Sequence, residues 1–244
     1  MADGRGPLPP SDPVATGDLL KLMAWLSPAF PVGAFAYSHG LESAIADGLV
    51  RSRADASGWI AALLRRGSGW NDLVLFAEAH RAVSRGDAAA LGEVAELGAA
   101  LAGSAERRIE TLDLGLAFAA AAEPWSGGDD RSDIGAAFDP AGGEGGLPYP
   151  VAIGALAARH ALLLEPALAA FAQAFAANLL GAAVRLVPLG QRDAVAALHA
   201  LEPLVTHAAR AAASSSLDDL GSAAILSEIA AMRHETLSTR LFRT

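Results

Sequence analysis

Residues 166–184 read PALAAFAQAFAANLLGAAV, and this stretch decides the fold. Pro166 occupies the favoured first turn of a helix, and Pro188 ends that helix at about residue 187. The stretch is apolar on every side, which is typical either of a membrane span or of a helix inside a core. Because Gln173 and Asn178 interrupt it and alanine dominates, we expect a fully buried central helix rather than a membrane span.

The rest of the sequence shows the same helical pattern. Hydrophobic residues make up 52% of the 244 residues and aromatic residues only 6%, so alanine and leucine supply most of the apolar content, and both favour helices. Apolar residues recur at helical spacing, and no segment alternates as a strand does. We therefore expect an all-α, single-domain bundle of about ten helices. Further helices are expected over residues 18–26, 38–47, 52–66, 70–84, 87–101, 104–122, 150–164, 191 onward and 222–238.

Local signals set the boundaries of these helices. Ser38 is the predicted N-cap of the second helix, and Ser52 opens the third with the spacing of a capping box. Glu202-Pro203 is expected to kink or split the helix that contains it. Residues 1–16 are rich in proline and glycine and are expected to form a disordered lead-in to a domain over residues 17–244. A Gly- and Asp-rich stretch, residues 123–146, is expected to be a long loop.

Charge and composition exclude several classes of function. The net charge is -9, from 27 acidic and 18 basic residues, and no basic run could follow a phosphate backbone, so we expect no nucleic-acid partner. The glycine cluster 142–146 carries an acid and lacks the lysine of a P-loop. Zero cysteines exclude disulfides and thiolate chemistry. The first residues lack the apolar stretch of a signal peptide, which favours a cytoplasmic protein with no membrane association.

The sequence also offers few combinations of residues that could form a catalytic site. The six histidines are scattered singly, and no GxSxG motif is present. His39 and Glu42 lie three residues apart and could meet on one helical face, so a small helical metalloenzyme using them with a distant histidine such as His80 is an alternative. A capping role for Ser38 and a hydrogen-bonded role for His39 explain these residues more simply. We therefore expect a protein that is not an enzyme.

The last eleven residues, HETLSTRLFRT over 234–244, end in a run that pairs two apolar side chains with two arginines. Arginine and aromatic residues are enriched at interface hot spots, so Arg240, Leu241, Phe242 and Arg243 suggest a docking tail. The other interpretation is a chain end with the Leu-Phe pair packed against the fold. The sequence alone leaves both open.

Three segments together resemble the urease accessory protein UreF family: WLSPAFPVGAFAYSHGLE over 25–42, AVRLVPLGQ over 183–191, and HETLSTRLFRT over 234–244. The resemblance implies an all-α homodimer that binds the accessory proteins UreD (UreH) and UreG and apo-urease. It implies a scaffold for nickel insertion that gates the GTPase cycle of UreG, with no cofactor bound by this chain because partners handle nickel and GTP. A helical adaptor of another complex is the alternative.

The resemblance also implies which residues bind partners. Glu42 and Arg185 are the strongest candidates, because a charge beside a structured apolar loop is poorly explained by core packing. The complete candidate set is Pro31, Gly33, Tyr37, Ser38, His39, Gly40, Leu41, Glu42, Glu106, Arg108, Arg185, Pro188, Gly190, Gln191, His234, Glu235, Arg240, Leu241, Phe242 and Arg243.

Overall fold

A computed structural model describes residues 14–126 and 146–244, and within these ranges the chain is helical and contains no strand. The predicted all-α class is confirmed. The elements in chain order are α1 (Thr16–Trp25), η1 (Ala34–Ala36), α2 (Leu41–Ala46), α3 (Arg53–Arg66), α4 (Ser68–Ser84), α5 (Ala88–Ala100), α6 (Ala105–Ala121), η2 (Glu123–Trp125), α8 (Tyr149–Arg159), α9 (Leu164–Leu186), α10 (Gln191–Ala213), η3 (Leu217–Asp219) and α11 (Ile225–His234), where η marks a short 3-10 helix.

Helix α9 lies at the centre of the molecule, as its sequence predicts. It packs against α10, α4, α3, α2, α8 and α1. By length and composition α9 could cross a membrane, with a mean hydropathy of 1.7, but half of that apolar window is buried within the fold. The prediction of a fully buried helix is therefore wrong for one face, where Ala174, Ala177 and Gly181 are half-buried and line a cavity. Small side chains on that face leave the space open.

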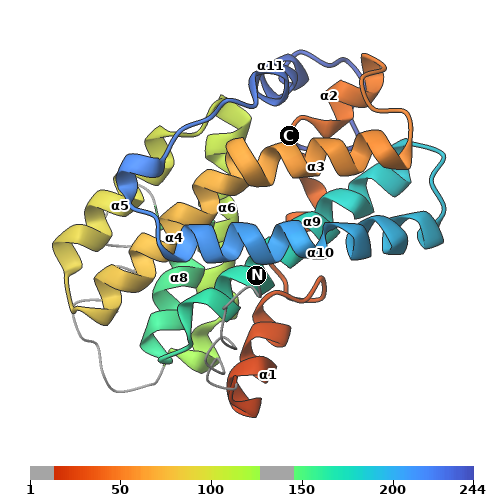
Figure 1. The fold of residues 1–244 in the computed structure, drawn as a ribbon. Helices are drawn as coiled ribbons and strands as arrows, with labels where there is room; N and C mark the ends of the chain where they lie inside the picture. Colours follow the sequence, from red (N-terminus) through yellow and green to blue (C-terminus); the bar gives the residue numbers. More distant parts are fainter. Residues whose placement is uncertain (1–13, 127–145) are drawn as a thin grey trace, which may run out of the picture.

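Helices α4 and α8 pack closely along their lengths, and glycine makes this approach possible. A Cβ at Gly154 of α8 would lie 2.4 Å from the carbonyl oxygen of Phe76 in α4. Buried side chains of both helices, including Phe76 and Ile153, belong to the main hydrophobic core, which extends along α9 and α10. Figure 1 shows the outcome: α4, α9 and α10 run through the middle, α1 lies at one end, and α2 and α11 lie together at the other.

Several predicted boundaries are confirmed. The Ser52 side chain caps α3 by accepting the Asp55 N–H at 3.2 Å. Two details differ from prediction. Ser38 is not the N-cap of α2, because the chain turns at Gly40 with φ 73° and the helix begins at Leu41. Helix α4 begins at Ser68 rather than at residue 70, since Gly67 alone breaks the chain between α3 and α4.

Two helices near the C-terminus also differ from prediction. Helix α10 continues unsplit through Pro203. Pro203 lies on the exposed face, where water can satisfy the carbonyl that proline leaves without a donor. Helix α11 ends at His234, four residues earlier than expected, because the chain then folds back toward α2.

Two predicted segments lie largely outside the described residues. Of the expected lead-in over residues 1–16, residues 1–13 are not described, and Thr16 opens α1. Of the expected loop over residues 123–146, residues 127–145 are not described, and the segment begins with the 3-10 helix η2.

Candidate functional site

Parts of the three signature segments, distant in the sequence, converge at the end of the molecule that carries α2 and α11: residues 36–42, residues 183–189 and the residues after His234. We call residues 235–244 the C-terminal segment. It packs between the loop before α2 and the end of α9, and Figure 1 shows the C-terminus beside α2. Phe242 is buried in a small core formed with Leu41 of α2 and Ala183 of α9. The convergence depends on glycine, because a Cβ at Gly40 would lie 2.7 Å from a backbone nitrogen of α11.

Glu42 holds the C-terminal segment in place. Its carboxylate accepts the backbone N–H groups of Leu241 at 2.7 Å and of Phe242 at 2.9 Å. The same carboxylate pairs with Nε2 of His234 at 3.0 Å. Burial raises the pKa of Glu42, but the hydrogen bonds from His234 and from the two backbone groups outweigh burial and lower it below its ordinary value. The structure therefore places Glu42 inside the fold, where it is almost fully buried.

His234 links α2 to α6. Its side chain is fully buried, and Nδ1 lies 2.7 Å from the carboxylate of Glu106. Glu106 also forms an ion pair with Arg240 of the C-terminal segment. One residue after His234, the Glu235 carboxylate accepts the N–H of Ala105 at 2.9 Å, at the first turn of α6. Acidic and basic side chains from α2, α6 and α11 thus form one continuous network around the segment.

A second network holds the last residue. The Thr244 carbonyl accepts the N–H of Ser38 at 3.0 Å and also the Ser38 hydroxyl. The Thr244 hydroxyl donates to Glu110 at 2.9 Å. Glu110 pairs in turn with Arg107 at 2.5 Å and with Nε2 of His39 at 3.1 Å. Burial raises the pKa of Glu110, but the adjacent Arg107 and His39 outweigh burial and lower it to about 2.

Arg185 of α9 contacts both the loop before α2 and the C-terminal segment. Its Nη2 donates to the Phe35 carbonyl at 3.0 Å, and its guanidinium lies over the Phe242 ring, 4.7 Å from the centroid. The Arg243 N–H donates to the Ala36 carbonyl at 2.7 Å. Arg185 remains exposed, so it can hold the segment and still face solvent.

The predicted site residues fall into two groups. The buried group packs inside the converged region: Tyr37, Ser38, His39, Gly40, Leu41, Glu42, His234 and Phe242. Glu106 and Gly33 are half-buried. The exposed group lies on the surface: Pro31, Arg108, Arg185, Pro188, Gly190, Gln191, Glu235, Arg240, Leu241 and Arg243. Pro188, Gly190 and Gln191 lie at the turn between α9 and α10 rather than at the C-terminal segment.

Sequence reasoning missed four side chains that complete the site. Arg107 and Glu110 line up with Glu106 on one face of α6, at the three- and four-residue spacing that a helical pattern makes visible. Asn178 of α9, read only as an interruption of an apolar run, donates to the Ala34 carbonyl at 3.0 Å. Thr244 gave no signal, because its role depends on where the chain folds back.

The residues of the alternative metal site are not brought together. His39 pairs with Glu110, Glu42 pairs with His234, and His80 lies 2.9 Å from the Leu162 carbonyl. Burial lowers the pKa of His80. Across residues 14–126 and 146–244, no group of three or more potential ligands is placed to hold a metal ion.

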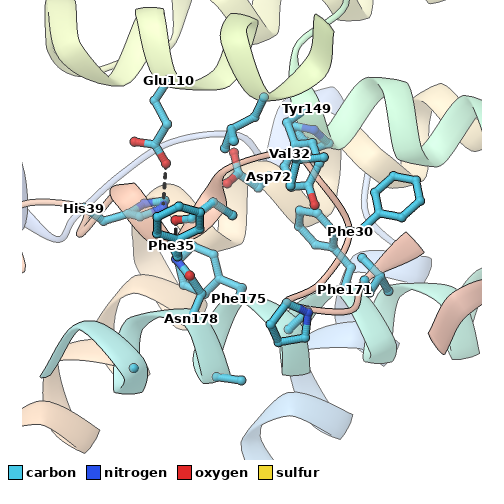
Figure 2. Close-up of a pocket in the computed structure, with 18 of the residues that line it drawn as sticks. Phe30, Val32, Phe35, His39, Asp72, Glu110, Tyr149, Phe171, Phe175 and Asn178 are labelled. Carbon is cyan, nitrogen blue, oxygen red and sulfur yellow. Dashed lines mark hydrogen bonds and ion pairs between the residues drawn. The ribbon is translucent and has the colours of Figure 1, made fainter. Parts of the chain in front are cut away.

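A cavity of about 300 Å³ lies beside the second network, between the loop 27–37 and the half-buried face of α9. Figure 2 shows His39, Asp72 and Glu110 with Asn178 and several phenylalanine rings around this space. Its polar residues come from α4, α6, α8, α9 and the loop before α2. The cavity therefore shares α6, α9 and this loop with the surface that holds the C-terminal segment.

The fold and site define a class of protein: an all-α protein whose own C-terminal segment is held by hydrogen bonds to buried carboxylates of α2 and α6. The chain matches the family model UreF over residues 50–202. It is 49% identical over 226 residues to the urease accessory protein UreF of Rhizobium leguminosarum bv. viciae, covering 93% of this chain and 96% of that protein. It is 51% identical over 229 residues to urease accessory protein UreF 1 of Brucella canis, covering 94% and 95%. The chain belongs to the UreF family of urease accessory proteins, and the resemblance seen in the sequence is confirmed.

Proposed function

We propose that this chain is a non-catalytic scaffold on which UreD (UreH), UreG and apo-urease assemble for nickel insertion, and that it gates the GTPase cycle of UreG. Family membership supports the association with urease activation. In this proposal the chain works in the cytoplasm as a homodimer and binds no cofactor itself, because UreG binds the GTP and nickel is the cargo of the complex.

The observation that carries the proposal is the convergence of parts of the three signature segments on one surface. Buried ion pairs and hydrogen bonds fix this surface, because Glu42 and Glu110 together anchor Thr244 and two backbone N–H groups of the C-terminal segment. Next to these anchors, Leu241 projects outward with 61% of its surface exposed. We assign shaping of the surface to the buried group of site residues and contact with partners to the exposed group.

Reconstitution of urease activation tests the scaffold. Purified apo-urease, UreD (UreH), UreG, nickel and GTP are combined with and without this chain, and urease activity is measured. We expect activation to require the chain. Full activation without it would contradict the proposal.

Substitutions of exposed residues distinguish a loss of partner binding from a loss of stability. Leu241→Ala and Arg108→Ala alter exposed side chains, so we expect weaker co-purification with partners at unchanged thermal stability. Glu202→Gln, at an exposed pair on α10, is the matched control. The proposed gating role is tested by measuring the rate of GTP hydrolysis by UreG with and without this chain. The same rate in both cases would contradict the gating role.

A further inference from the structure

The cavity beside the C-terminal segment contains an acidic group that the proposed function does not use. Asp72 of α4 contacts one cation among the described residues, Arg107, whose Nη2 lies 3.8 Å away. That distance is too long for a hydrogen bond. Arg107 is instead engaged by Glu110 at 2.5 Å. Among the described side chains and backbone groups, none donates a hydrogen bond to the Asp72 carboxylate, which is an expensive arrangement for a largely buried acid.

The charges at this end of the cavity do not balance. Asp72 and Glu110 contribute two carboxylates and Arg107 contributes one guanidinium, so this inner end carries a net negative charge when His39 is neutral. The second guanidinium that lines the cavity, that of Arg185, lies at the exposed surface. Burial raises the pKa of Asp72, and Glu110 raises it further, although Arg107 and His39 lower it. A positively charged group placed beside Asp72 would stabilise its ionised form.

The remaining polar atoms of the cavity also favour a hydrogen-bond donor as ligand. The amide nitrogen of Asn178 donates to the Ala34 carbonyl at 3.0 Å, which leaves Oδ1 as an acceptor without a donor among the described residues. The Tyr149 hydroxyl lines the same space, and burial with the nearby Asp72 raises its pKa. It therefore stays neutral and is able to accept a hydrogen bond.

The walls of the cavity are mostly apolar, and four phenylalanines contribute to them. Figure 2 shows the rings of Phe30, Phe35, Phe171 and Phe175 around the polar end. The faces of aromatic rings attract cations and pack well against apolar groups. Phe35 is 63% exposed and Arg185 lies at the surface, so the cavity reaches solvent.

We propose that this cavity binds a small organic cation, a primary ammonium joined to a compact apolar body. Asp72 and Asn178 accept hydrogen bonds from the ammonium group, and the phenylalanine rings surround the body. A volume of about 300 Å³ restricts the ligand to a small molecule, because pockets for drug-sized ligands start at roughly this size.

Benzylammonium, benzyl alcohol and benzoate share a ring and differ in charge, so they test the proposal as a set. Each is titrated into the full chain at neutral pH, and binding is followed by ligand-observed NMR and calorimetry. We expect saturable binding of benzylammonium at one site per chain, binding of the alcohol that is weaker by about tenfold or more, and the weakest binding for benzoate. Absence of saturable binding, or equal binding of the cation and the alcohol, would overturn the proposal.

Two variants locate the site. Asp72→Asn keeps the shape of the side chain and removes the charge, so it should weaken benzylammonium by about tenfold and leave benzyl alcohol nearly unchanged. Asp218→Asn, on the exposed 3-10 helix η3, is the matched control. Gly181→Leu fills the cavity from α9, where an added Cβ meets no atom within 4 Å, and it should block both ligands while the fold is retained. Unchanged cation binding in both Asp72→Asn and Gly181→Leu would contradict this location.

Discussion

At the scale of single residues, the site depends on buried carboxylates that are fully paired. Glu42 and Glu110 each accept bonds from the C-terminal segment and from a side chain of the bundle. Burying a charge is costly, and removing one partner leaves the other charge uncompensated. The free energy of unfolding should therefore respond strongly to either residue.

Glu42→Gln should release the C-terminal segment. Leu241 and Phe242 donate to different oxygens of Glu42, so glutamine loses the charge and its amide nitrogen would face one of these two N–H groups. We expect a loss of about 2–4 kcal/mol in the free energy of unfolding and faster proteolysis within residues 235–244. Urea denaturation and limited proteolysis measure the two effects. With Glu202→Gln as control, equal stability of the two variants would show that Glu42 is not an anchor.

Glu110 should make the protein sensitive to acid. Its pKa in the folded state is about 2, below its ordinary value of 4.5. A lowered folded pKa means that the stabilisation is complete above about pH 4.5 and is lost as the pH falls toward 2. The ionised carboxylate contributes on the order of 3 kcal/mol above that range. Burial raises the pKa of Asp72, so that residue acts in the opposite direction.

Denaturation of wild type and Glu110→Gln across pH 2–7 isolates this contribution. The difference in unfolding free energy should be largest at neutral pH and should shrink steadily below pH 4.5. A difference that stays constant with pH would assign the effect of the substitution to shape rather than to charge.

At the scale of elements, close helix packing requires glycine at particular positions. In α6 a Cβ at Gly115 would lie 1.8 Å from the Leu147 carbonyl oxygen, and in α8 a Cβ at Gly154 would lie 2.4 Å from that of Phe76. Other helical glycines have open space around them, as Gly58 in α3 and Gly92 in α5 do. The role of each glycine is thus set by its neighbours rather than by its helix.

Gly154→Ala should push α8 away from α4. Because the obstacle is backbone, the helices must shift, and we expect a loss of about 1–3 kcal/mol or more. Gly92→Ala is the matched control and should stabilise by about 0.5–1 kcal/mol, since alanine favours the helix and nothing obstructs its methyl group. Thermal unfolding of the two variants should move the midpoint in opposite directions, and similar shifts would contradict this packing argument.

The C-terminal segment should tolerate Leu241→Ala and not Phe242→Ala. The two residues are adjacent, but Leu241 is 61% exposed and Phe242 only 4%. Truncation of Phe242 removes contacts with α2 and α9 and should cost about 3–5 kcal/mol, whereas Leu241→Ala should cost less than about 0.5 kcal/mol. Chemical denaturation measures both. Equal losses of stability in the two variants would mean that the C-terminal segment does not pack with Phe242 inward and Leu241 outward.

The arrangement of these side chains also shows how the C-terminal segment as a whole is placed in the fold. His234, Phe242 and Thr244 fill buried positions among α2, α6 and α9. Of the two sequence interpretations, packing against the fold is confirmed for Phe242 but not for Leu241, which faces solvent. Docking of partners on this segment stays a prediction.

At the scale of the whole molecule, α9 connects the separate parts of the interior. Leu168 and Leu179 belong to the main core, and one turn later Ala182 and Ala183 belong to the small core around Phe242. One helix therefore contributes to both cores. This continuity favours a single folding unit over residues 17–244.

The chain should accordingly unfold in one cooperative transition. Differential scanning calorimetry should give one peak with matching calorimetric and van't Hoff enthalpies. Far-UV circular dichroism and tryptophan fluorescence should report the same midpoint. Two resolved transitions would divide residues 17–244 into more than one domain.

The sequence by itself determined the class of fold, most helix boundaries and the family. Apolar spacing, capping serines and helix-ending glycines are local, so they can be read without knowing which segments meet. Only the tertiary structure decided that Glu42 faces inward, that Glu110 and Thr244 belong to the site, and that one side of α9 borders a cavity. The first two facts depend on the fold-back after His234, which brings Glu42 together with residues about 200 positions away, and the cavity depends on how α4, α6, α8 and α9 pack. No local pattern in the chain encodes contacts over such separations.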